Sequence, residues 1–148
     1  MMRKLFAMAA LLLALAACGD NKDNPENGSG GGSTNTKVSV TGIWELASVS
    51  TKATVGSVNV NVYIDFASDG SFSLYQKIGE GRYTLFTGTY SLSADNQLSG
   101  KYASGSSWGP YSAAMSGSNL TLTSAGGKET DTYKKISAIP ESVLKNLN

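Results

Sequence analysis

The segment from residue 58 to residue 66 reads VNVNVYIDF and alternates between apolar and polar side chains. All five even-numbered positions are aliphatic or aromatic, and three of the four odd-numbered positions are polar. Successive side chains of an extended strand point to opposite faces, so the alternation predicts a strand with one buried face and one wet face. A chain that repeats this pattern is expected to fold as an all-β domain.

Short turn sequences divide the chain after residue 37 into segments of similar length. Asp69-Gly70 tolerates the positive φ that a tight hairpin needs, and further turns are predicted at residues 79–81, 94–96, 105–107, 117–118 and 126–127. Eight short strands joined in this way predict an antiparallel up-and-down β-barrel, whose closure removes exposed sheet edges. The predicted strands lie near residues 41–50, 57–67, 71–77, 82–92, 97–104, 110–116, 119–124 and 129–136.

The last residues of the chain have a different pattern. Residues 139–145 read IPESVLK, with a proline at an early position and apolar residues after it, which predicts a short helix or turn that caps the barrel. Several predicted strands have only six or seven residues, whereas strands that cross a membrane need about 9–11. The barrel is therefore predicted to stand outside the bilayer.

The N-terminus has the features of an export signal. Arg3 and Lys4 precede thirteen uncharged, mostly apolar residues, a run too short for a spanning helix of about 20 residues. Leu15-Ala16-Ala17-Cys18 resembles the lipobox of bacterial lipoproteins, and Cys18 is the only cysteine of the chain. The resemblance implies that residues 1–17 are a lipoprotein signal peptide and that fatty acyl chains such as palmitate anchor Cys18 stably in a membrane. The alternative is an ordinary signal peptide with an incidental cysteine.

Residues 19–36 read GDNKDNPENGSGGGSTNT and contain no aliphatic or aromatic side chain. Such a segment buries too little surface to fold, so residues 18–36 are predicted to be the lipidated cysteine and a flexible tether, with the barrel domain at residues 37–148. The acidic start of the tether resembles a surface-export signal of lipoproteins from Bacteroidota. The alternative is a plain soluble linker.

Composition excludes several classes of function. The chain has 12 basic and 11 acidic residues and no histidine. Loss of Arg3 and Lys4 with the signal leaves ten basic and eleven acidic residues, a net charge of −1, so no nucleic-acid partner is expected. Without histidine, the commonest general base and metal ligand is missing. We therefore expect no enzymatic activity, no catalytic residues, no metal site and no cofactor.

Three patterns look catalytic but have simpler explanations. Residues 105–109 match G-x-S-x-G, yet a nucleophile elbow needs a strand-to-helix turn and a histidine base. Residues 142–145 match S-x-x-K without its partner motifs. Two carboxylate pairs, Asp65 with Asp69 and Glu129 with Asp131, have the composition that glycosidases use, but solvent-exposed strands and turns also contain such pairs.

Gly42-Ile43-Trp44 opens the first predicted strand with Gly-x-Trp, which resembles the lipocalin signature. The resemblance implies that Trp44, with Gly42, plugs one end of the barrel. The wider sequence is similar to the small lipocalin-like domains of Bacteroidota lipoproteins over roughly residues 38–140. The supporting segments are residues 64–66, 69–72, 87–90, 98–102, 107–109 and 133–136. Residues 41–44 and 87–90 also resemble avidins, although avidins place several tryptophans around biotin and this chain has two.

The chain departs from typical lipocalins in two ways. An arginine near the final strand usually stacks on the tryptophan, whereas Arg82 is the only arginine after the signal segment and lies on an earlier strand. Lys134 or Lys135 is the available substitute, without the planar stacking group. The domain is also short, which predicts a barrel packed nearly solid.

The aromatic residues divide into two groups. Most of the twelve aromatic side chains in the domain are expected to fill the core. Tyr63 and Tyr75 fall on the face opposite the apolar positions, and Trp108 falls at a predicted turn tip. These three residues are predicted either to form an exposed contact patch or to pack across neighbouring strands.

The leading functional prediction is a lipid-anchored protein of the outer membrane, on its periplasmic face or at the cell surface. Small barrels present an apolar interior and an opening rimmed by loops, so a small apolar ligand is expected in the mouth. The alternative is a ligand-free interaction module, either an accessory of an outer-membrane complex or an enzyme inhibitor, with an envelope protein as partner. The residues predicted to line the ligand site are Val60, Val62, Ile64, Phe72 and Leu74.

Overall fold

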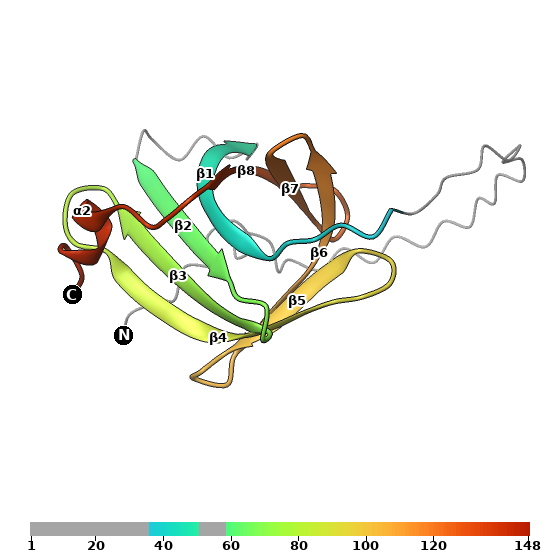
Figure 1. Ribbon diagram of the computed structural model, residues 1–148, viewed down its shortest axis with the longest axis horizontal. Helices are drawn as coiled ribbons and strands as arrows, with labels where there is room; N and C mark the ends of the chain where they lie inside the picture. The colour runs from blue at the N-terminus through green and yellow to red at the C-terminus, as the bar shows by residue number, and fades with distance from the viewer. Residues whose placement is uncertain (1–35, 51–58) are drawn as a thin grey trace, which may run out of the picture.

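The computed structural model describes residues 36–50 and 59–148, which form a closed eight-stranded antiparallel β-barrel with one short helix (Figure 1). Each strand pairs with the next along the chain, and the last pairs with the first. The predicted fold class is confirmed. The elements are β1 (Gly42–Ser50), β2 (Val60–Phe66), β3 (Ser71–Ile78), β4 (Thr84–Leu92), β5 (Gln97–Tyr102), β6 (Ser107–Ser116), β7 (Asn119–Ser124), β8 (Thr130–Ile136) and α2 (Glu141–Leu144).

The period of two in the sequence becomes an inner and an outer face in the barrel. On β2 and β3 the even-numbered residues are buried from Val62 to Gln76, apart from the turn between the strands, and the odd-numbered ones are partly exposed. Residues opposite each other in an antiparallel pair share a face, so Ile64 and Leu74 both point inward. Burial of these apolar side chains supplies the main stabilisation of the closed sheet.

The two ends of the barrel differ. At one end β1 begins, and the turns at residues 67–70, 93–96 and 117–118 join the strands; we call it the plugged end. At the other end β1 finishes and β2 begins, and the turns at residues 79–83, 103–106 and 125–129 join the strands; we call it the mouth.

The C-terminal segment ends beside the mouth, where Figure 1 shows α2 next to the turn between β3 and β4. The backbone N–H of Tyr83 donates to the Asn146 carbonyl at 2.8 Å, and the N–H of Asn148 donates to the Tyr83 carbonyl at 3.0 Å. Val143 is buried, and Pro140 stands immediately before the helix, where its missing N–H costs nothing. The predicted short C-terminal helix is confirmed, and the hydrogen bonds of the residues after it hold the chain end against the barrel.

Candidate functional site

Trp44 is the centre of the plugged end. Its side chain is 0% exposed, and its indole Nε1–H donates to the Val40 carbonyl at 2.7 Å. The ammonium of Lys135 lies 5.5 Å from the centroid of the indole ring, within the range of a cation–π interaction. Lys135 therefore takes the position for which the sequence offered Lys134 or Lys135, whereas Arg82 is exposed in the turn between β3 and β4.

Gly42 is needed where β1 enters the plug. Its φ is +134°, a conformation that side chains rarely adopt, and an added Cβ would lie 3.0 Å from Lys135 Cε. The chain before β1 is tied to the same end, because the N–H of Val38 donates to Asn96 Oδ1 at 3.0 Å. Side chains and the incoming backbone thus pack together at this end of the barrel.

An aromatic cluster fills the middle of the barrel. The Phe72 ring meets the rings of Tyr102 and Trp108 edge to face, with centroids 5.7 Å and 5.5 Å apart. Two glycines make room for it: an added Cβ at Gly88 would lie 2.8 Å from the Phe72 ring, and one at Gly100 would overlap the Trp108 indole. The interior between the two ends is therefore densely packed with rings.

The prediction that Trp108 lies exposed at a turn tip is wrong. Trp108 is only 7% exposed, because β6 begins at Ser107 rather than near residue 110. The register between β5 and β6 shifts between Leu98 and Gly100, and this irregularity lets the strand run on through the Gly109–Pro110 peptide. Trp108 is a core residue and takes no part in a surface patch.

The residues predicted to line a ligand site lie along the inner face of β2 and β3, and their exposure to solvent increases toward the mouth. Val62, Ile64, Phe72 and Leu74 are all buried inside the barrel. Val60 lies on the same inward-facing register at the mouth and is 42% exposed. Four of the five residues therefore belong to the packed interior, and the fifth is the one that a molecule arriving at the mouth would reach.

Two acidic residues lie near the mouth at the start of β8, on the far side of β1 from β2. Glu129 lies just before β8 and Asp131 lies within it, and both share a face with the buried Tyr133. Asp131 also stands opposite the buried Leu122 of β7. Both carboxylates are partly buried, and Glu129 Oε2 and Asp131 Oδ1 are shielded from solvent without a hydrogen-bond partner among the described residues. The interpretation of Glu129 and Asp131 as solvent-exposed strand residues is therefore wrong. We call these two residues the acidic wall.

The surroundings of the acidic wall change its protonation. Burial, and then the charge of Glu129, raise the pKa of Asp131 to about 6, and burial raises the pKa of Glu129. Burial and the two carboxylates raise the pKa of Tyr111 to about 12. Burial and the nearby Asp131 hold the pKa of Tyr133 well above its ordinary value. The mouth thus combines an apolar wall on β2 and β3 with titratable side chains from β6, from β8 and from the turn before β8.

Sequence reasoning did not place the acidic wall on the inner face. The available signal was the position of Tyr133: once it is taken as a core residue, the period of two puts Asp131 and Glu129 on the same side. The other carboxylate pair is unlike it. Asp69 is an exposed turn residue whose pKa is lowered by hydrogen bonds from the side chain and backbone of Ser71, and Asp65 lies on the outer face of β2.

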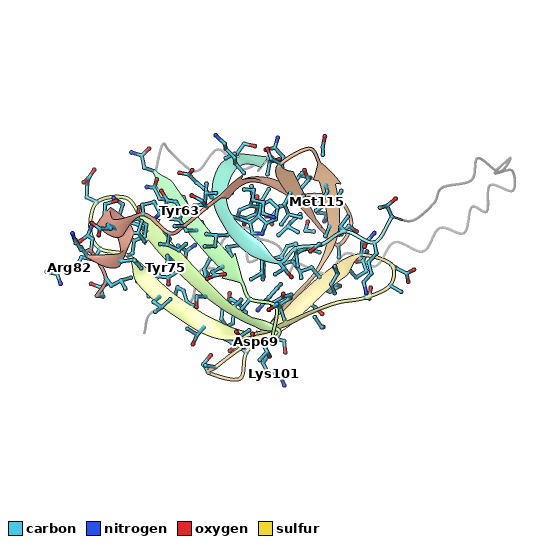
Figure 2. The ribbon with its side chains drawn as sticks, viewed as in Figure 1. Tyr63, Asp69, Tyr75, Arg82, Lys101 and Met115 are labelled. Carbon is cyan, nitrogen blue, oxygen red and sulfur yellow. The ribbon has the colours of Figure 1, made fainter. Side chains whose placement is uncertain are left out.

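Tyr63 and Tyr75 lie opposite each other on the outer face, as predicted, but both are only partly exposed (Figure 2). The Tyr63 hydroxyl donates to Glu45 Oε1 at 3.1 Å, and its ring lies 6.1 Å from that of Tyr83. Packing across neighbouring strands therefore accounts for Tyr63. Tyr75 stands opposite Leu85, which is 44% exposed on the outer face.

The remaining motifs are structural in the described part of the chain. Residues 103–106 form the turn between β5 and β6, so the G-x-S-x-G match begins in a β-turn and continues into a strand. Across residues 36–50 and 59–148 there is no group of three or more side chains suited to hold a metal ion. No helix in those ranges has the length and apolar character required to cross a membrane. Cys18, the signal segment and nearly all of the tether lie outside the described residues.

Comparison with known proteins identifies a family. The family model described as a lipocalin-like domain matches residues 40–122. Among solved structures, the chain is similar to the lipoprotein YedD from Klebsiella pneumoniae subsp. pneumoniae MGH 78578, with 12% identity and a TM-score of 0.47. That similarity covers 72% of this chain and 79% of the other. A search of curated proteins found no match.

Proposed function

Because this chain belongs to the family of lipocalin-like domains, we propose that it is a lipid-anchored protein of the outer membrane whose barrel mouth holds a small apolar molecule. The observation that carries the ligand proposal is the change in exposure along the inner face of β2. Phe66 near the plugged end is 1% exposed, and Val60 at the mouth is 42% exposed. Apolar side chains that point inward and still meet solvent offer a surface for burying an apolar ligand.

The ligand proposal is tested with the fluorescent apolar probe N-phenyl-1-naphthylamine and two matched variants. Val60→Ser removes apolar surface from the inner face, and Leu85→Ser removes an equally exposed apolar side chain from the outer face. We expect Val60→Ser to raise the Kd of the probe about fivefold, which corresponds to about 1 kcal/mol of lost burial, and Leu85→Ser to leave it unchanged. Equal effects of the two variants, or no probe binding by the unsubstituted protein, would contradict the proposal.

The natural ligand is sought in a separate experiment. Protein purified from its own host is examined by native mass spectrometry, where a bound apolar molecule adds a discrete mass that is lost on denaturation. If preparations in several mild detergents give only the mass of the acylated chain, the result counts against a resident ligand.

The anchor proposal is supported by the sequence around Cys18 and by the tether that follows it. Cys18→Ala removes the acylated thiol, so the variant is expected to leave the membrane fraction, whereas Ser33→Ala in the tether is expected to remain there. Separation of inner and outer membranes on a density gradient then locates the anchored protein. Retention of the Cys18→Ala variant in the membrane would refute lipidation as the anchor.

A second candidate function is a ligand-free interaction module. It is favoured by the ring packing around Phe72, which fills the space that a deep ligand would need, and by the exposed Leu85 beside Tyr75 on the outer face. Crosslinking in solubilised membranes followed by pull-down distinguishes the two functions, because only this one requires a stoichiometric protein partner. Loss of the partner on Leu85→Asp but not on Val60→Asp would support it.

A further inference from the structure

The acidic wall lies at the seam that closes the barrel. β8 pairs with β7 on one side and with β1 on the other, and the β1 register shifts between Leu46 and Ser48. In the backbone register Asp131 pairs with Val49 of β1 and with Leu122 of β7, and the buried Leu122 side chain carries no charge to balance the carboxylate. The ladder of β8 with β1 therefore passes directly beside a shielded carboxylate.

Among the described residues, the titratable side chains close to Asp131 are all acids. Glu129 comes from the turn just before β8, Tyr133 from β8 and Tyr111 from β6, and Tyr102 of β5 lies close to Tyr133 and Tyr111. At neutral pH two negative charges share this space, and one oxygen of each carboxylate makes no hydrogen bond in the described part of the chain. Protonation removes the repulsion between the two carboxylates and supplies an O–H donor to a group that has only acceptors.

We infer that Glu129 and Asp131 form a proton-operated latch on the β8 seam, which tightens when they are protonated and loosens when both are ionised. Opening of the seam exposes the carboxylates to water, where ionisation carries no penalty. The opening equilibrium is therefore linked to proton release. The β8 seam is therefore most firmly paired in mildly acidic surroundings.

The direction and size of the effect follow from linkage. The pKa of Asp131 is raised from 3.8 to about 6 in the closed barrel, so closure is favoured below this range and weakens as pH rises through it. A change of about two pKa units allows at most about a hundredfold change in the opening equilibrium. Residual exposure of the carboxylates to solvent makes the change in the opening equilibrium smaller. We therefore expect the protection of the seam against hydrogen exchange to fall about five- to tenfold between roughly pH 4.5 and 7.5.

Amide hydrogen exchange of the full chain, read by mass spectrometry, tests the latch. Labelling times are scaled to the intrinsic exchange rate at each pH, so that only the opening equilibrium is compared. Peptides from β8 and from the part of β1 that pairs with it are expected to lose five- to tenfold protection as pH rises, while peptides from β3 and β4 change less than twofold. Equal changes throughout the barrel, or none in β8, would overturn the inference.

Two isosteric variants separate the latch from a general effect of charge. Asp131→Asn is expected to abolish most of the pH dependence and to keep β8 protected at neutral pH, and Glu129→Gln is expected to reduce it in part. Asp65→Asn makes the same substitution on the outer face and is expected to leave the pH dependence unchanged. If Asp131→Asn retains the pH dependence of the unsubstituted protein, or if Asp65→Asn abolishes it, the latch is refuted. The exchange of the unsubstituted protein remains decisive should a variant fold poorly.

Discussion

Replacing Trp44 by phenylalanine tests whether the plug depends on a specific hydrogen bond or only on an aromatic ring. Phenylalanine keeps a ring in the buried position but has no N–H, so the Val40 carbonyl loses the donor that lies 2.7 Å away. Val40 is itself buried, which leaves its carbonyl without ready access to water. We therefore expect Trp44→Phe to destabilise the barrel strongly although the substitution is conservative.

The magnitude has two parts. A buried carbonyl without a partner costs about 1–3 kcal/mol, and the void left by the smaller ring adds about 1 kcal/mol. The sum is about 2–4 kcal/mol. For a domain of about 110 residues, each kcal/mol lowers the Tm by about 4 °C, so the expected decrease is about 8–16 °C.

Thermal and urea denaturation followed by circular dichroism measure the effect. The control is Tyr63→Phe, which also removes one hydrogen-bond donor from an aromatic residue, in this case the 3.1 Å bond to Glu45 on the partly exposed outer face. We expect the control to lose less than about 1 kcal/mol. Equal Tm values for the two variants would show that the bond to Val40 does not hold the plug.

Three further predictions concern other parts of the barrel. Gly88→Ala places a Cβ against the Lys101 carbonyl oxygen, a backbone atom that cannot move aside, so a loss of about 2 kcal/mol or more is expected in urea unfolding. Lys135→Ala removes the ammonium above Trp44 and is expected to cost about 0.5–1 kcal/mol by the same assay, less as salt is added. The fold raises the pKa of Tyr111 from 10.0 to about 12, so the stability that its neutral hydroxyl contributes is present below pH 10 and is lost between pH 10 and 12. Tyr111→Phe should therefore make the loss of stability with rising alkaline pH less steep. An unchanged alkaline unfolding curve would contradict the raised pKa of Tyr111.

The sequence predicted the barrel because its signal is local and repeated. The alternation through residues 58–66 and the Asp69-Gly70 turn need no information about distant residues, and among the described residues a strand or a turn lies within a few residues of each predicted one. The Gly-x-Trp pattern placed Trp44 near one end of the barrel, where the structure has it buried, while its role as a plug stays a prediction. The choice of Lys135 over Lys134 required the fold, since the register between β1 and β8 places Lys135 opposite Trp44.

Two features could not be predicted because they depend on packing between strands. Trp108 precedes Gly109-Pro110, which resembles a turn in sequence, and its burial depends on the space that Gly100 leaves on the neighbouring strand. Glu129 and Asp131 are charged residues, for which the general rule favours an outer position. Their inner position follows from Tyr133, whose burial sets the face for the whole strand.

The chain enters the barrel at the end that Trp44 seals. Asn96, in the turn between β4 and β5 at that end, bonds to both Val38 and the Thr36 carbonyl. Under the proposed anchoring at Cys18, the tether therefore joins the barrel at the Trp44 end, and Val60 and Asp131 lie toward the end that the tether leaves free.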